Sequence, residues 1–327
     1  MSRRRTPLVV LALALPVTLG GCGVGTSLAG VHDAPAERTD GASVSAGTAQ
    51  KVADRLVGEA VTVSTKSGTS ADSERAEVLS GPALREVQAA VASKDSTSRT
   101  GRTVKDLEVL AVSRGTQWPR AVLATSQTEG VQYLHALVAT SADAPYTLFA
   151  DVPMAAGSSV PALAPVEQGS QVTVSKAPPQ EVTSAATAWA KGVSFPAAKK
   201  SPQDVSVRDG FSAALKKNAK ATNKDLGDLA DYRQRQAVAP GETVSFELVD
   251  GGAISFLPMT RTDTITATDK LKELKIEQQA LKHVLDASTV KRALSVKHAE
   301  TLALVTPAEG KARVVGASDV LQSAKGS

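Results

Sequence analysis

The sequence predicts an α+β protein of two tandem domains, each with helices packed on an antiparallel sheet. In each half of the chain, helical spacing of apolar residues comes first and period-two alternation follows. The alternating runs are separated by short turns, which favours antiparallel meanders over parallel βαβ units. About 306 of the 327 residues remain after removal of a 21-residue leader, and this length favours two domains.

The N-terminus has the features of an export signal. Arg3, Arg4 and Arg5 precede an uncharged, mostly apolar stretch from residue 6 to 18, and small residues follow. The apolar run is about a dozen residues long, whereas a helix needs roughly twenty to cross hydrocarbon. We therefore expect residues 1–21 to be a signal peptide and not a permanent membrane span.

The residues after this stretch resemble the bacterial lipobox, which has an aliphatic residue, two small residues and a cysteine. Leu19, Gly20, Gly21 and Cys22 match that pattern. The resemblance implies cleavage before Cys22 and a thioether to a diacylglyceryl group, with acyl chains such as palmitate. Membrane lipid is then a partner, and the protein is anchored to the outer face of the cytoplasmic membrane. An ordinary secretory signal with a chance cysteine is the alternative.

The cysteine count and the charge exclude several kinds of protein. Cys22 is the only cysteine, which excludes disulfides and Cys-based zinc sites. The formal charge of +4 includes three arginines of the leader, so 37 minus 3 leaves 34 basic against 33 acidic residues. A nearly neutral, exported chain gives no indication of a nucleic-acid partner.

The first domain is expected over residues 48–176, after a lipidated and flexible tether over residues 22–47. The tether is rich in Gly, Ala, Ser and Thr and lacks a periodic apolar face. As a flexible coil its typical reach is on the order of 25–30 Å. The spacing then predicts helices over residues 48–63 and 82–91 and strands over 104–113, 117–126, 131–141 and 146–153.

The second domain is expected over residues 177–327. Its first residues, Ala177, Pro178 and Pro179, are typical of a break between domains. A short strand is expected before it, at residues 171–175. The pattern predicts helices over residues 181–193 and 207–221 and strands over 244–249, 253–267 and 290–305. Residues 270–285 fit either a helix or a strand with a loop.

This order of elements resembles two domains of the cystatin-like type, also called nuclear-transport-factor-like, in which a helix packs into a curved, cone-shaped sheet. The mature chain is also similar to a group of actinobacterial envelope lipoproteins of unknown function. That similarity rests on the lipobox, the two-domain pattern and the strand from Phe256 to Thr266 with Arg261, Thr262, Asp263 and Thr264 at its centre. It implies an envelope location and brings no catalytic residues.

Two groups of residues are candidate sites. Tyr133 and His135 share one face of a predicted strand and would line a small-molecule pocket, although an ordinary solvent or core position explains them equally well. A basic segment offers four lysines for contact with an anionic envelope polymer or lipid headgroups: Lys216, Lys217, Lys220 and Lys224. Lysine-rich helix surfaces also serve solubility alone.

No catalytic, metal-binding or phosphate-binding motif occurs in the sequence, so we expect neither a metal nor a cofactor. The first hypothesis is a non-catalytic envelope lipoprotein that binds or scaffolds a cell-wall polymer or an envelope protein. A second is an enzyme that uses the cone interior as a pocket for a small molecule. A third is a solute-binding lipoprotein, which the predicted meanders disfavour.

Overall fold

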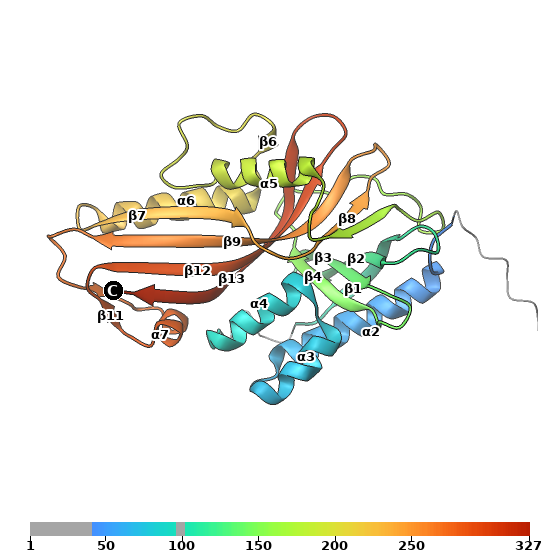
Figure 1. Ribbon diagram of the computed structural model, residues 1–327, viewed down its shortest axis with the longest axis horizontal. Coiled ribbons are helices and arrows are strands. Elements are labelled where there is room, and N and C mark those ends of the chain that lie inside the picture. Colours follow the sequence, from blue (N-terminus) through green and yellow to red (C-terminus); the bar gives the residue numbers. More distant parts are fainter. Residues whose placement is uncertain (1–40, 96–101) are drawn as a thin grey trace, which may run out of the picture. The chain divides into compact units, whose positions relative to one another are not determined.

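Two large, mainly antiparallel sheets, a two-stranded ribbon and the helices packed against them form the described part of the chain, in a computed structural model that describes residues 41–95 and 102–327 (Figure 1). The helices are α2 (Ala46–Thr65), α3 (Asp72–Val78), α4 (Gly81–Ala92), α5 (Gln180–Gly192), α6 (Gly210–Leu226) and α7 (Gln279–Leu285). Within these residues no helix is both long and apolar enough to span a bilayer. The predicted α+β class is confirmed.

The first sheet is the predicted meander. It contains β1 (Lys105–Val112), β2 (Arg120–Thr128), β3 (Val131–Ala139) and β4 (Thr147–Pro153), in that order. Thr128 pairs with Val131, and the two residues between them, Glu129 and Gly130, both have positive φ. Positive φ at both central residues is the geometry of a tight type I′ hairpin, which matches the right-handed twist of the strands.

The second sheet is larger and its strand order is less regular. The strand order is β5-β8-β9-β12-β13-β6, and β7 pairs with the part of β9 that β8 does not pair with. The strands are β5 (Val172–Ser175), β6 (Val205–Ser206), β7 (Ala230–Val238), β8 (Thr243–Glu247), β9 (Ala253–Ala267), β12 (Ala293–Thr306) and β13 (Ala312–Gly326). The ambiguous residues 270–285 contain both kinds of element: β10 (Leu274–Lys275), which pairs with β11 (Thr289–Val290), and α7.

Helices pack on both sheets, and α4 contacts both of them. Ser45 is the N-cap of α2, and its Oγ accepts a hydrogen bond from the amide of Thr48. The buried stripe of α2 packs with α4 on the first sheet. On the second sheet, α5 and α6 lie across the long strands, and the wholly buried Trp189 of α5 donates its indole N–H to Ser212 of α6 over 2.8 Å.

The two sheets share an apolar core. Leu123 and Phe149 of the first sheet belong to the same buried cluster as Phe256 and Val305 of the second. The sheets also join at their edges, where Met154, just after β4, forms a bridge with Gly316 of β13. Because β5 pairs with β8, the residues just before the expected boundary at 176 belong to the later sheet; the two-domain division stays a prediction.

The end of the tether was placed too late by the sequence. The amide of Gly115 donates to the carbonyl of Gly41, and the amide of Ser43 donates to the carbonyl of Ser113, each over 2.8 Å. These backbone bonds fix a segment that has no apolar periodicity, which is why composition alone did not detect it. The expected signal peptide, the lipobox-like residues and the expected tether up to residue 40 lie outside the described residues.

Candidate functional site

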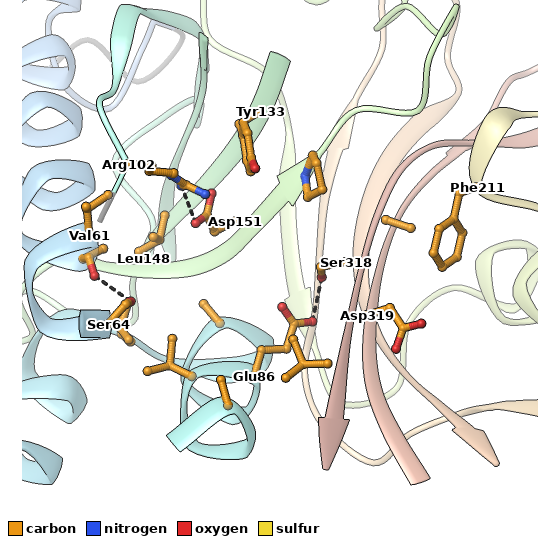
Figure 2. Close-up of a pocket in the computed structure, with 18 residues that line it drawn as sticks. Val61, Ser64, Glu86, Arg102, Tyr133, Leu148, Asp151, Phe211, Ser318 and Asp319 are labelled. Atoms are coloured by element: carbon orange, nitrogen blue, oxygen red, sulfur yellow. Dashed lines mark hydrogen bonds and ion pairs between the residues drawn. The ribbon is translucent and has the colours of Figure 1, made fainter. Parts of the chain in front are cut away.

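A cavity of about 350 Å³ lies where α2, α4, the first sheet, α6 and the edge of β13 meet (Figure 2). Its volume is in the range of small-molecule pockets. Much of its wall is apolar, with Leu79, Val87, Leu148 and Phe211 as its larger apolar side chains. Charged groups interrupt this wall at three places, which gives the cavity an amphipathic lining.

The first charged group contains Arg102, Asp151 and Tyr133. The guanidinium of Arg102 pairs with Asp151 and lies over the ring of Tyr133, 4.1 Å from the ring centroid. Burial raises the pKa of Asp151, but the charge of Arg102 and the contact with His135 outweigh it and bring the pKa to about 2. Asp151 therefore stays ionised at neutral pH, and the charge of Arg102 balances its negative charge.

The predicted pocket pair is split between the wall and the layer behind it. Tyr133 lines the cavity, whereas His135 is completely buried and does not. The His135 ring stacks on that of Tyr133 with centroids 6.4 Å apart; its Nδ1 lies 3.1 Å from Oδ1 of Asp151 and its Nε2 lies 2.7 Å from Oγ of Ser126. His135 is therefore in a position to orient Asp151 and not to touch a ligand.

The second charged group is Glu86 on the inner face of α4. Its Oε1 accepts hydrogen bonds from the hydroxyls of Thr301 on β12 and Ser318 on β13. Burial raises the pKa of Glu86 to about 7, despite those two bonds and the charge of Arg85. Glu86 therefore changes its protonation state near neutral pH, at the wall of the cavity.

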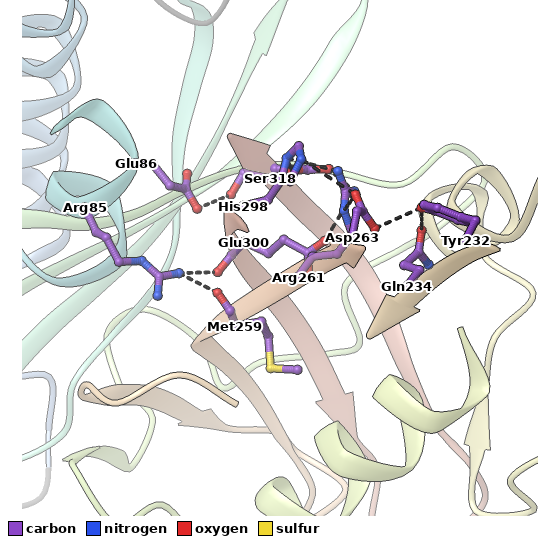
Figure 3. Close-up of polar contacts among 11 residues, drawn as sticks. Arg85, Glu86, Tyr232, Gln234, Met259, Arg261, Asp263, His298, Glu300 and Ser318 are labelled. Atoms are coloured by element: carbon purple, nitrogen blue, oxygen red, sulfur yellow. Dashed lines mark hydrogen bonds and ion pairs between the residues drawn. The ribbon is translucent and has the colours of Figure 1, made fainter. Parts of the chain in front are cut away.

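The third charged group is Asp319 of β13, which connects the cavity to a polar network on the second sheet (Figure 3). Arg261 pairs with Asp319 and with Asp263, and Nδ1 of His298 lies 2.7 Å from Oδ1 of Asp319. Burial raises the pKa of Asp319, but the bond to His298 and the charge of Arg261 lower it below its ordinary value. The carboxylate is therefore ionised and paired.

The same network contains Glu300, a carboxyl group whose pKa is shifted in the opposite direction to that of Asp319. Glu300 is completely buried, and Nη1 of Arg261 lies 3.6 Å from its Oε1. Burial and the nearby charge of Asp319 raise the pKa of Glu300 well above its ordinary value. Arg261 therefore lies among three carboxyl groups at and behind the cavity wall, those of Asp263, Glu300 and Asp319.

The four candidate lysines do not line this cavity. Lys216 donates to the carbonyl of Val207 over 2.6 Å, so it stabilises the start of α6 locally. Lys217, Lys220 and Lys224 are exposed on α6, at a spacing that places them along one side of the helix. Their contact with an anionic polymer or lipid stays a prediction.

Most of the cavity's polar residues were not predicted as site residues from the sequence. Glu86 shares a helix face with the buried Ala83 and Ala90, and an acid on an apolar face is a signal that could have been used. Asp151 and Asp319 lie in strands without a sequence motif and acquire their partners only in the fold.

Comparisons with family models, with curated proteins and with solved structures give no match for this chain. Within residues 41–95 and 102–327, no group of three or more His, Cys, Asp or Glu side chains is placed to hold a metal ion. Fold and site together define an α+β protein with an amphipathic, small-molecule-sized cavity between its helices and sheets.

Proposed function

We propose that this chain is an envelope lipoprotein, anchored through Cys22 to the outer face of the cytoplasmic membrane, whose folded body binds a small molecule in the cavity. The observation that carries the binding role is the lining: apolar walls with a few convergent polar groups, in a volume of about 350 Å³. The leader and lipobox of the sequence support the location.

Binding is favoured over chemistry because two of the three carboxylates on the wall are already neutralised. Asp151 is paired with Arg102, and Asp319 is paired with Arg261. Such internal pairs hold side chains in place and leave little free charge for a reacting group. A rigid, largely apolar wall of this kind suits recognition of a ligand's shape.

A second candidate is an enzyme that uses the same cavity, and the observation that favours it is Glu86. A carboxyl whose pKa is about 7 can take or give a proton near neutral pH. Under this alternative, a molecule bound in the cavity would be recovered with a changed mass, whereas a binding module returns it unchanged.

Blocking the cavity is expected to abolish ligand binding. The mature chain with Cys22→Ala has no lipid anchor and can be studied without detergent; the neutral fluorescent probe N-phenyl-1-naphthylamine should bind it at one saturable site. Val61 lines the cavity from α2, so Val61→Trp should weaken probe binding at least tenfold by filling the space.

Thr62→Trp is the matched control, since Thr62 is the next residue of α2, is exposed and does not line the cavity. Its probe affinity should equal that of the parent chain. Equal binding by both tryptophan variants, or no saturable binding by the parent, would refute the proposed binding site.

A further inference from the structure

The three carboxylates on the cavity wall differ in their partners. Asp151 and Asp319 each pair with an arginine. Among the described residues, Glu86 has no cationic side chain within ion-pair distance. Arg85, its neighbour on α4, instead directs Nη2 to the backbone carbonyls of Met259 and Glu300, at 2.8 and 2.7 Å (Figure 3).

The surroundings of Glu86 hold its carboxyl in a defined position at the cavity. Thr301 and Ser318 both donate to the same oxygen, Oε1, and Ser318 itself lines the cavity. On the same helix, Ala83, Val87 and Ala90 contribute apolar wall on either side of Glu86. A carboxylate in such a setting lacks the solvation that water would provide.

We infer that the natural ligand carries a protonated amine that pairs with Glu86 and an apolar body that fills the rest of the cavity. This inference rests on the proposed binding function. An ammonium group would supply the direct ion-pair partner that no described side chain provides, and charge-assisted hydrogen bonds are among the strongest in proteins. An anionic ligand would instead meet a carboxylate, and Arg102, which lines the cavity, is already paired with Asp151. A neutral ligand would form no ion pair with Glu86.

Pairing with an amine couples binding to the protonation of Glu86. The pKa of about 7 means that Glu86 is mostly protonated at about pH 6, and a bound cation lowers this pKa. Binding therefore releases close to one proton at about pH 6 and much less at about pH 8, and the amine affinity rises about tenfold between them. The protonation of Glu86 takes place among several other charged and titratable groups. These are Arg85, Arg102, Tyr133, Asp151, Arg261, Glu300 and Asp319.

A matched series of ligands tests the inference: octylammonium, octanol and octanoate, which share one chain length and differ in the head group. Each is titrated calorimetrically into the mature Cys22→Ala chain, in two buffers of different ionisation enthalpy to count protons, and each competes with N-phenyl-1-naphthylamine. We expect octylammonium to bind at least tenfold more tightly than the other two at about pH 8. Glu86→Gln should remove the preference for the amine over the alcohol.

The possible results distinguish a failure of the amine inference from a failure of the proposed binding function. If the fluorescent probe binds in the cavity but octylammonium binds no better than octanol, binds more weakly than octanoate, or releases no proton at about pH 6, the amine inference is wrong and the binding function stands. If neither the probe nor any member of the series binds, the proposed function itself fails. The comparison of ligands and the proton count use the parent chain, so they remain decisive even if Glu86→Gln does not fold.

Discussion

Replacing Glu86 with glutamine is expected to remove a loss of stability that the parent protein suffers as pH rises. The pKa of Glu86 is raised from 4.5 to about 7 by burial, so the fold favours the protonated carboxyl. The stabilising contribution of the protonated form is complete below about pH 4.5 and is lost as pH rises through 7. Between about pH 5 and about pH 8 the loss is about 2–3 kcal/mol in the free energy of unfolding.

Urea unfolding of the parent and of Glu86→Gln at these two pH values measures the effect. The variant should lose about 2–3 kcal/mol less than the parent over this range, because its amide does not ionise. Glu77→Gln is the control, since Glu77 is exposed on α3 and its substitution should leave the pH dependence unchanged. Identical pH dependence in the parent and in Glu86→Gln would mean that Glu86 is not held in its protonated form.

Gly316→Ala is expected to destabilise the joint between the two sheets. A Cβ at Gly316 would lie 2.8 Å from the carbonyl oxygen of Pro153 and 3.3 Å from Cα of Met154, both of which are backbone atoms. Backbone atoms cannot rotate away, so β4 and β13 would have to separate. We expect a loss of about 1–3 kcal/mol in the free energy of unfolding.

The same change should weaken probe binding, because β4 and β13 both contribute to the cavity wall. Gly58→Ala is the matched control: Gly58 is exposed in α2, and its added Cβ would meet nothing within 4 Å. In a helix this change should stabilise by up to about 1 kcal/mol. Equal stability of Gly316→Ala and the parent, measured by urea unfolding, would show that the sheets do not pack as closely as described.

The meander and two of the long strands, β9 and β12, were predictable from the sequence. Strands β1 to β4 are runs rich in β-forming residues and are separated by turn residues, and both signals are local. The strand predicted over residues 253–267 has the observed bounds of β9. The helix expected from residue 82 begins at Gly81 in α4, after Ser80, which forms no capping bond and whose Oγ accepts from Thr147 instead.

Other elements were missed because their buried faces are polar or made of small residues. The inner face of β7 carries Tyr232, Gln234 and Gln236, so its alternation does not appear as hydrophobic periodicity. In β13, glycine, alanine and serine interrupt the apolar pattern. Such strands are specified by their pairing with β9 and β12 and not by their own composition.

The candidate site was predicted least well, because its charges are assembled across distant segments. Glu86 meets Thr301 and Ser318, which are more than two hundred residues away along the chain. Arg102, which precedes β1, meets Asp151 of β4, 49 residues later in the chain. The sequence did single out Tyr133, but the role of His135 as a buried partner of Asp151 depends on the strand register that places them opposite each other.

The intact mass of the protein isolated from its own membranes tests the account most directly. We expect a chain that begins at Cys22 and is heavier than the polypeptide by a diacylglyceryl group, and we expect Cys22→Ala to move the protein from the membrane fraction to the soluble fraction. An unmodified polypeptide, or a Cys22→Ala variant that stays as firmly bound to membranes as the parent, would contradict the lipid anchor and with it the proposed role in the envelope.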